Sequence, residues 1–410
     1  MSADSAREIR FVIIGPAHPY GGGVAQHTAR LASELAKVPM VRVSIESWKA
    51  QYPRWIHRFQ AHVSSEMAEI PFTGAIFRQL EWFSPLSWLA VGLRIRRAEL
   101  VLFSVVSPFQ VVPYSVMRIL LSKRTRKIGL IHNVLPHERT RLDRLLMRLF
   151  ARVIDGALVH DRESARTLLS LSRRPLAIVT AALPSPWDQE MPKNRGFEED
   201  TTLNRGNLKL LFFGNVRPYK GLDILIEALG HCPDTELLVA GKIWGDKGDF
   251  EGQIEKNNLT SRVTFVDKYI PVREFEELFR GSDILVMPYR SGTGSIVPRL
   301  AMSFGLPVIA SDVGSISESI VDGANGIVLA EITPERLASA VCALNQDRKL
   351  LNTMKREASA TENPHGWKNY VAACIGLLGK NEMDAADAVA KGFADFLGQD
   401  LGASKRFSTK

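Results

Sequence analysis

Short apolar runs alternate with amphipathic helical patterns along almost the whole chain, and this alternation is the strongest constraint on its fold. In the first half the apolar runs are IRFVIIG (9–15), VRVSIES (41–47), ELVLFSV (99–105), KIGLIH (127–132), DGALVH (155–160) and LAIVTA (176–181). Apolar strands separated by helices are typical of parallel βα units, because a parallel connection needs a crossover, usually a helix. The first half therefore predicts a doubly wound parallel sheet.

A polar segment rich in charge, Pro, Gly and Asn interrupts this pattern at 186–207 and indicates a linker. Beyond it the pattern resumes with LKLLFFG (208–214), ELLVAG (236–241), RVTFVD (262–267), DILVMPY (283–289), LPVIASD (306–312) and GIVLA (326–330). We therefore expect an α/β protein with two Rossmann-like domains, at 1–185 and 208–362, facing each other across a cleft. C-terminal helices are expected at 363–410, and the 410 residues suit two domains.

The positive charge is concentrated in the first half of the chain. Residues 1–185 hold 26 Lys+Arg against 13 Asp+Glu (+13), and the remainder holds 26 against 31 (−5), which sum to the net +8. A basic half is either a solvated Arg-rich surface or one that attracts an anionic membrane or substrate. The segment 78–97, with Trp82, Phe83, Trp88 and Leu93 among arginines, suits a membrane interface and a packed core equally well. Only the charge suggests nucleic-acid binding, and no known nucleic-acid-reading module accompanies it. A nucleic acid is therefore not expected as a partner.

The cysteines and the first residues predict the compartment. Cys232, Cys342 and Cys374 are far apart and form no metal-ligand spacing, so we expect no zinc site, no disulfide framework and a reducing environment. The first ten residues lack the apolar centre of a signal peptide, and no uninterrupted apolar run reaches 18 residues. The expectation is a cytoplasmic protein that is soluble or peripheral on the membrane.

Ligands of open parallel sheets bind beyond the carboxyl ends of the strands, so motifs there are the candidates for function. The first is FFGNVRPYKGLDILIEAL (212–229), in which Gly214 ends a strand and Lys220 precedes a helix. Arg217 offers a planar fork and Lys220 a point charge, both suited to a diphosphate. The alternative is that both cations decorate a solvated turn.

The second motif is PYRSGTGSIVPRLAMSFGLPVIASDVGS (288–315). Its small residues let backbone amides close on a phosphate, which makes Thr293, Gly294, Ser295 and Ile296 candidate phosphate-binding residues. Glu318 follows the next strand and begins a helix. The alternatives are an ordinary Gly/Ser turn and an acid that only stabilises a helix start.

The third motif, GPAHPYGGGVAQH (15–27), places Gly22 and Gly23 directly after the first strand, where they could approach a phosphate or an acceptor. A dinucleotide fingerprint would need glycine at position 26, which is glutamine. Glu46 ends the second strand about where a ribose-binding acid would lie. The missing glycine therefore weakens an NAD-dependent oxidoreductase as an alternative, while Glu46 keeps it open.

The fourth motif, LIHNVLPHE (130–138), puts His132 after a strand, where it could bond a sugar hydroxyl or the reacting group. A structural histidine is the alternative, and the strand-end position favours function.

Together the four motifs resemble the family 4 (group 1) glycosyltransferases of GT-B architecture, along nearly the whole chain. GPAHPYGGGVAQHTARLASELA is similar to the family's N-terminal glycine loop, and FFGNVRPYKGLDILIEAL to its G-R-x-x-x-x-K-G stretch. AMSFGLPVIASDVGSISESIVDGANGIVL resembles its segment ending in G-G-x-x-E, and HNVLPHE resembles the His-Asn segment of some bacterial members.

The resemblance implies transfer of a sugar from a nucleotide diphosphate donor to an acceptor hydroxyl, with retention and without a bound metal or other cofactor. It implies that Lys220 holds the pyrophosphate, with Arg217 in place of the arginine that the family has at Asn215. Residues 293–296 would present amides, His132 would face the sugar and Glu318 would lie near the nucleotide. The implied acceptor is a glycan or a lipid-linked molecule, in polysaccharide or glycolipid synthesis at the inner face of the cell membrane.

One departure concerns the family's paired glutamates, which would fall at Gly292 and Leu300. In the family these carboxylates hold sugar and ribose hydroxyls, so the identity of the donor stays open. A two-domain sugar-nucleotide epimerase, which would share the architecture and need no acceptor, also remains as an alternative.

Overall fold

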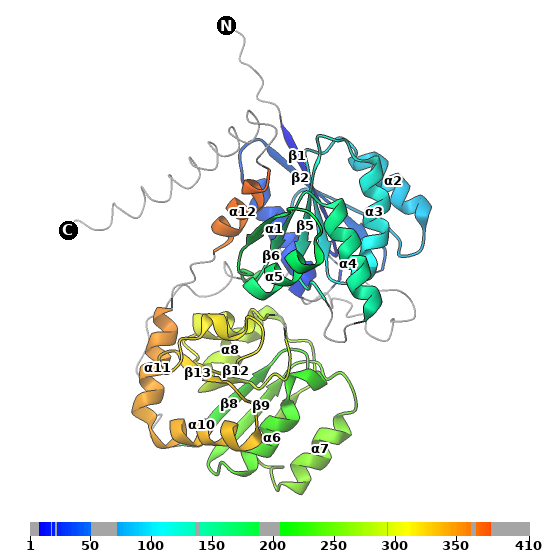
Figure 1. Cartoon of the computed structure of the whole chain (residues 1–410). Coiled ribbons are helices and arrows are strands. Elements are labelled where there is room, and N and C mark those ends of the chain that lie inside the picture. Colours follow the sequence, from blue (N-terminus) through cyan, green and yellow to red (C-terminus); the bar gives the residue numbers. More distant parts are fainter. Residues whose placement is uncertain are drawn as a thin grey trace, which may run out of the picture. The chain divides into compact units, whose positions relative to one another are not determined.

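The computed structural model describes residues 8–17, 19–20, 23–50, 72–135, 140–187, 206–292, 294–361 and 366–378. Contacts group the chain into two compact units, one of Met1–Pro186 with His365–Lys410 and one of Trp187–Pro364 (Figure 1). The first unit is discontinuous, since residues 366–378 return to it.

The first unit is built on a seven-stranded sheet in the order β3-β2-β1-β4-β5-β6-β7, and every neighbouring pair is parallel. The strands are β1 (Ile9–Ile14), β2 (Val41–Trp48), β3 (Ala75–Leu80), β4 (Leu100–Val105), β5 (Arg126–Ile131), β6 (Gly156–Val159) and β7 (Ala177–Thr180). The predicted parallel sheet is confirmed. The sequence analysis missed β3, an edge strand with three of its six residues exposed, which therefore lacks a continuous apolar run.

Helices cover both faces of this sheet. The helices are α1 (Gly23–Ala36), α2 (Pro85–Ile95), α3 (Val111–Leu120), α4 (Arg141–Val153), α5 (Arg162–Leu171) and α12 (Trp367–Gly376). One core packs α2, α3, α4 and α5 against the sheet, and a second packs α1 and α12 against the other face. α4 begins at a capping box, in which Thr140 and Asp143 satisfy each other's backbone N–H groups.

α12 shows how the C-terminal segment joins the first unit, a placement that the sequence did not indicate. The indole of Trp367 donates to the Ser185 carbonyl (2.8 Å), and Arg126 donates to the Leu377 carbonyl (3.2 and 3.3 Å). Tyr370 is 1% exposed beside α1. These contacts explain why the predicted C-terminal helices do not form a region of their own within the described residues.

The second unit contains a six-stranded parallel sheet in the order β10-β9-β8-β11-β12-β13. Its strands are β8 (Leu208–Phe213), β9 (Thr235–Ala240), β10 (Val263–Val266), β11 (Ile284–Met287), β12 (Val308–Ser311) and β13 (Gly326–Leu329). Its α-helices are α6 (Leu222–Gly230), α7 (Lys247–Lys256), α8 (Phe275–Arg280), α9 (Val297–Ser303), α10 (Pro334–Gln346) and α11 (Arg348–Ala360). Apolar cores on both faces make this a second doubly wound sheet, as predicted.

Two glycines bring backbones unusually close at the carboxyl edge of this sheet. Gly221 has φ +71°, and a Cβ there would lie 2.0 Å from the carbonyl oxygen of Pro288, just beyond β11. Gly241 has φ +151°, and its Cβ would lie 2.2 Å from the carbonyl oxygen of Gly214. The loops after β8, β9 and β11 are therefore packed backbone to backbone, which only glycine permits.

We expect Gly221→Ala to destabilise the protein. The new methyl group meets the Pro288 carbonyl and the residue must hold a left-handed conformation, which together lower the free energy of unfolding by about 2–4 kcal/mol. Chemical denaturation measures the change. Gly252→Ala is the control, because Gly252 lies in α7 with no atom near its would-be Cβ, and there alanine should stabilise by about 0.5–1 kcal/mol. Equal effects of the two substitutions would contradict the close approach.

Candidate functional site

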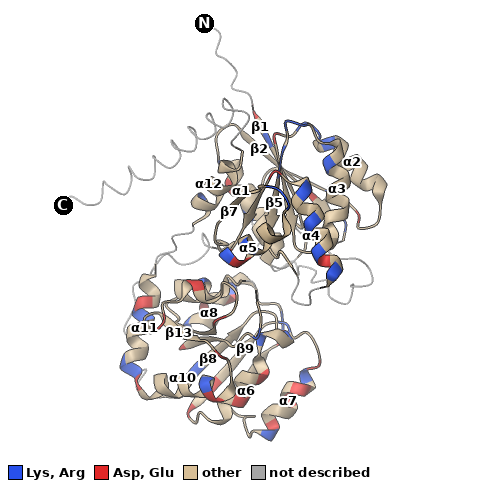
Figure 2. Cartoon of the chain, in the orientation of Figure 1, with Lys and Arg blue, Asp and Glu red and all other residues tan. Residues whose placement is uncertain are grey.

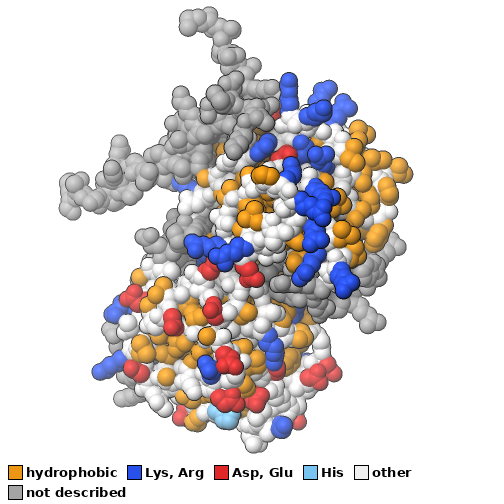
Figure 3. Space-filling model, in the orientation of Figure 1, with side chains coloured by type: hydrophobic (Ala, Val, Ile, Leu, Met, Phe, Trp, Pro, Cys, Tyr) orange, Lys and Arg blue, Asp and Glu red, His pale blue; other side chains and the backbone are white. Residues whose placement is uncertain are grey.

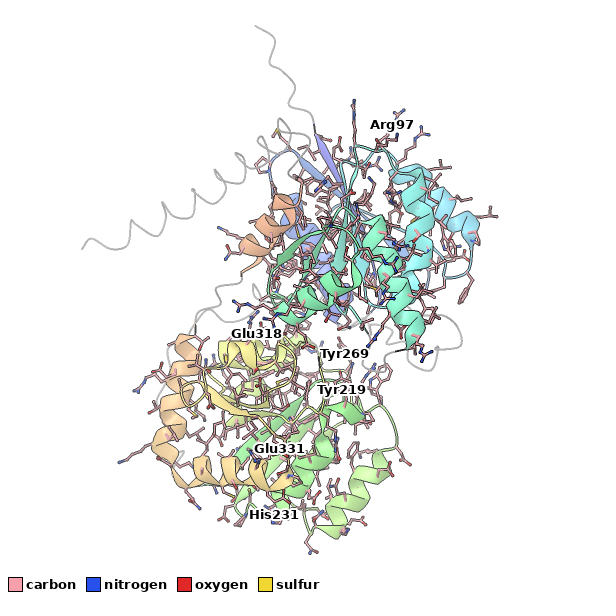
Figure 4. All side chains as sticks on the ribbon, viewed as in Figure 1. Arg97, Tyr219, His231, Tyr269, Glu318 and Glu331 are labelled. Atoms are coloured by element: carbon pink, nitrogen blue, oxygen red, sulfur yellow. The ribbon has the colours of Figure 1, made fainter. Side chains whose placement is uncertain are left out.

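The carboxyl ends of β8, β11 and β12 are neighbours, because these strands are adjacent in the sheet. The loops that follow them carry the predicted motifs at 214–221, 288–296 and 312–318. Tyr219 and Glu318 lie at one end of the second unit, whereas His231, after α6, lies at the opposite end (Figure 4). The structure thus brings the two predicted phosphate motifs to one edge.

Lys220 is the most unusual side chain at this edge. It ends the short helix Pro218–Lys220, is 9% exposed, and lies with Nζ 5.3 Å from the ring centre of Tyr289. A Cβ on Gly214 would lie 3.3 Å from the same Nζ, so the ammonium sits beside the end of β8. No carboxylate in the described part of the chain pairs with it. Burial, and then the charge of Arg217, lower the pKa of Lys220 to about 8.

Arg217 lies next to Lys220 and is exposed. Its guanidinium carbon is 4.2 Å from the ring centre of Trp244, in the loop after β9. Stacking on an indole orients the guanidinium plane while leaving the N–H groups at its edge able to donate. The two predicted cations are therefore both present, one enclosed and one oriented by an aromatic ring.

Arg290, a third cation at this edge, serves the structure. Its guanidinium forms an ion pair with Asp223 and donates to the Pro218 carbonyl (2.9 Å), while its backbone N–H donates to the Tyr219 carbonyl (2.8 Å). These bonds tie the loop after β11 to the loop after β8. Arg290 is thereby neutralised, unlike Lys220.

The Gly/Ser turn lies within reach of the same tyrosine. Ser295 hydrogen-bonds Tyr289, and its hydroxyl also accepts from the Val297 N–H (3.2 Å). Gly294 approaches the loop after β12, since a Cβ there would lie 2.7 Å from the Ser315 hydroxyl. Glu318 lies three residues further on, in the short helix Ser317–Ser319, and Ile296 directly precedes α9. Thr293 lies outside the described residues.

The two positions of the family's glutamates are occupied differently. Leu300 is 2% exposed and packs in an apolar core, and a Cβ on Gly292 would contact Ile316 at 3.1 Å. Position 300 therefore serves packing in this chain. Neither position therefore offers a carboxylate.

In the first unit, His132 follows β5 and joins two histidines that the sequence analysis did not connect with it. His160, after β6, places Nε2 3.2 Å from Nδ1 of His132, and the ring of His27 on α1 is 5.2 Å from that of His132. His27 is 1% exposed with neither ring nitrogen hydrogen-bonded to a described residue. Burial lowers the pKa of all three histidines, with their mutual charges adding to the effect on His27 and His132.

The glycine motif of the first unit is only partly described. Gly22 lies outside the described residues, as do His137 and Glu138 of the fourth motif. Gly23 begins α1, and its would-be Cβ meets open space, so packing does not require glycine there.

The ribose-binding role considered for Glu46 does not fit the structure. Its side chain is buried, and its two oxygens accept from Nε and Nη2 of Arg94 at 2.8 and 2.6 Å. The carboxylate is therefore already paired with Arg94 inside the unit and is not available to bind a ribose. This removes the feature that favoured a dinucleotide site.

Solved structures of low sequence identity share the fold of the chain. Sucrose-phosphate synthase from Thermosynechococcus elongatus is 16% identical, with a TM-score of 0.66 over 97% of this chain and all of that one. Anabaena Alr3699/HepE in complex with UDP-glucose is 16% identical, with a TM-score of 0.65 over 96% of this chain and all of the other. These likenesses show the fold, the GT-B architecture of two Rossmann-like domains.

Residues 195–361 match the family model described as glycosyl transferases group 1, the family that the sequence motifs resemble. A lipopolysaccharide core biosynthesis mannosyltransferase, LpsB, from Rhizobium meliloti is 32% identical over 149 residues. The alignment covers 34% of this chain and 42% of the relative, so the chain spans less than half the length of that curated relative.

Sequence reasoning missed several residues that lie beside the candidate residues of each unit. Tyr289, Trp244 and His160 each lie just after a strand, and that position was the signal that could have found them. Among the residues that the structure describes, no group of three or more metal-ligating side chains is placed to hold a metal ion.

The buried histidines predict a pH dependence of stability. Their folded pKa values lie below 6.5, that of His160 at about 4, so below pH 6.5 the unfolded chain binds protons that the folded unit does not. The free energy of unfolding is therefore undiminished by these histidines above pH 6.5. It decreases as the pH falls toward 4, by about 1.4 kcal/mol per pH unit for each histidine.

We expect His27→Leu to reduce the fall in unfolding free energy between pH 6.5 and 5, measured by denaturation at each pH. His231→Leu is the control, since His231 is exposed on the second unit and its loss should leave the slope unchanged. An unchanged slope in His27→Leu would contradict the assignment.

Proposed function

We propose that the chain is a glycosyltransferase that moves a sugar from a nucleotide diphosphate donor to an acceptor hydroxyl, with retention. The observation that carries this is Lys220, a buried ammonium with no described carboxylate partner, beside Arg217 at the carboxyl edge of a parallel sheet. A buried, unpaired charge is costly, and an anionic ligand would offset that cost. The family match over 195–361 and the UDP-glucose bound by a structural neighbour support a nucleotide-sugar donor.

The proposed mechanism uses electrostatics. Lys220, Arg217 and the backbone amides at 293–296 neutralise the diphosphate, so charge that develops on the leaving group meets preorganised donors. Two cations supply the neutralisation that a metal would otherwise provide, and we propose no metal or other cofactor. His132 in the first unit faces the sugar, and Glu318 lies near the nucleotide.

Lys220→Met tests separately how the buried charge affects stability and how it affects the binding of a diphosphate. Without a ligand, the variant should be as stable as the wild type or more stable, because a buried ammonium is replaced by an apolar side chain of similar length. Its affinity for a nucleoside diphosphate should fall about 10- to 100-fold, through the loss of a charge-assisted hydrogen bond worth roughly 1.5–3 kcal/mol. Denaturation and titration calorimetry measure the two effects.

Lys242→Met is the matched control. Lys242 is half exposed and pairs with Asp267 at the surface of the same unit, so the same substitution there should leave affinity unchanged. Unchanged nucleoside diphosphate affinity in Lys220→Met would refute the proposed phosphate site. Loss of transfer with intact binding would place Lys220 in the chemical step alone.

We also propose that the acceptor is a glycan or a lipid-linked molecule met at an anionic membrane surface. Most of the exposed large hydrophobic side chains among the described residues lie on the neighbouring helices α2, α3 and α4 or on the residues just before α2 and α3. They are Phe83, Leu86, Leu89, Leu93, Phe109, Val112, Ile119, Leu142, Leu145 and Leu149. We call this set the α2–α4 face, and Figure 3 shows hydrophobic side chains beside Lys and Arg on the first unit.

Arginines accompany the apolar residues of the α2–α4 face. On α4 the exposed positions alternate between Arg141, Arg144 and Arg148 and the leucines of the face, and Figure 2 shows Lys and Arg positions along this helix. Apolar side chains with adjacent cations are the pattern of a helix that lies in a membrane interface of anionic lipids.

The tryptophans of segment 78–97 are not part of this face. Trp88 is 8% exposed and donates to the Glu81 carbonyl, and Trp82 stacks on Trp48 at 4.4 Å. No helix in the described ranges combines the length and apolarity needed to cross a bilayer. The α2–α4 face is what supports our proposal of a peripheral position on the cytoplasmic leaflet.

Flotation with vesicles of phosphatidylcholine and phosphatidylglycerol tests the α2–α4 face. We expect the wild type to float at low salt, and Leu86→Glu with Leu145→Glu to stay in the bottom fraction, since each glutamate removes apolar area and adds repulsion. Val321→Glu is the control, because Val321 is 62% exposed but lies on the second unit. Equal flotation of the double variant, or no flotation of the wild type, would remove the membrane from the proposal.

A further inference from the structure

A chain of two hydrogen bonds leads from a backbone carbonyl to His132. The Ala181 N–H donates to the Val159 carbonyl, which extends the β6–β7 ladder and places the Ala181 carbonyl 3.4 Å from Nδ1 of His160. On the other side of that ring, Nε2 lies 3.2 Å from Nδ1 of His132.

The carbonyl decides the direction of both bonds. A carbonyl oxygen only accepts, so Nδ1 of His160 carries the hydrogen. In a neutral imidazole the other nitrogen then has the lone pair, so Nε2 of His160 accepts and Nδ1 of His132 must donate. Burial holds the pKa of both rings below neutrality, so both are neutral at pH 7.

This direction leaves the lone pair of His132 on Nε2. That atom is buried and has no hydrogen-bond partner among the residues that the structure describes. A buried acceptor without a donor is costly, and a ligand hydroxyl would satisfy it.

We propose that His160 is a positioning residue, which fixes His132 in the Nδ1–H tautomer so that Nε2 of His132 accepts a hydrogen bond from a hydroxyl of the substrate. That the hydroxyl belongs to a sugar rests on the proposed function; the tautomer does not. An Nε2–H tautomer would instead present a donor, and a hydroxyl would have to turn its lone pair toward it.

The packing around His160 holds the ring in place. His160 lies nearly parallel to the ring of Tyr370 on α12, with centroids 6.0 Å apart, and the ring of His27 lies 6.1 Å away. The C-terminal segment therefore contributes a wall to this cluster. A phenylalanine at position 160 would keep that ring packing and remove the acceptor.

Long-range ¹H–¹⁵N correlation spectra of the full-length protein test the tautomer directly at pH 7. The His132 signals are assigned by their loss in His132→Gln. We expect a protonated Nδ1 and a bare Nε2 for His132 in the wild type, a shift toward Nε2–H in His160→Phe, and retention of Nδ1–H in His160→Gln, whose amide oxygen can still accept. An Nε2–H form of His132 in the wild type, or no change in His160→Phe, would overturn the proposal.

The wild-type spectrum is informative even where a variant fails to fold, and it requires no activity. A transfer assay adds the functional arm: kcat/KM should fall about tenfold or more in His160→Phe and recover in His160→Gln. If the wild-type tautomer is as stated but no nucleotide sugar is turned over, the proposed function fails while the positioning role stands. Equal loss in both variants would reduce His160 to a packing residue.

Discussion

The burial of the Lys220 ammonium, with no carboxylate partner among the residues that the structure describes, is the constraint on which the packing at the carboxyl edge of the second sheet depends. Enclosing a cation in this way requires close packing around it, and the structure supplies Tyr289 on one side and the end of β8 at Gly214 on the other. Gly221 makes the enclosure possible, since any side chain there would collide with the backbone after β11. The Arg290–Asp223 ion pair then holds together the loops after β8 and β11, and because its charges neutralise each other it adds no net charge at this edge.

The fold was largely predictable because its signal is periodic. Buried parallel strands read as continuous apolar runs, and twelve such runs were identified in two sets. The strand β3 was not predicted because it lies at an edge with half of its residues exposed, so no continuous apolar run marks it. The return of α12 to the first unit was not predicted, because its contacts join residues far apart in the sequence. Arg126 and the Leu377 carbonyl, for example, are 251 positions apart.

The candidate site was predictable in position and less so in composition. The rule that parallel sheets bind ligands at their carboxyl ends correctly grouped Gly214, Lys220 and the 294–296 turn at one edge. It could not indicate that Tyr289 would lie under the ammonium or that Trp244 would stack on Arg217, because such contacts depend on rotamers and loop paths. The histidine cluster joins positions 27, 132 and 160, which only the completed sheet brings together.

A crystal of the protein with a bound nucleoside diphosphate tests the central claim most directly. The account predicts the diphosphate at the carboxyl ends of β8 and β11, with a phosphate oxygen within hydrogen-bond distance of Lys220 Nζ and the Arg217 guanidinium nearby. Nucleotide density elsewhere, with the Lys220 ammonium still enclosed and unliganded, would contradict it.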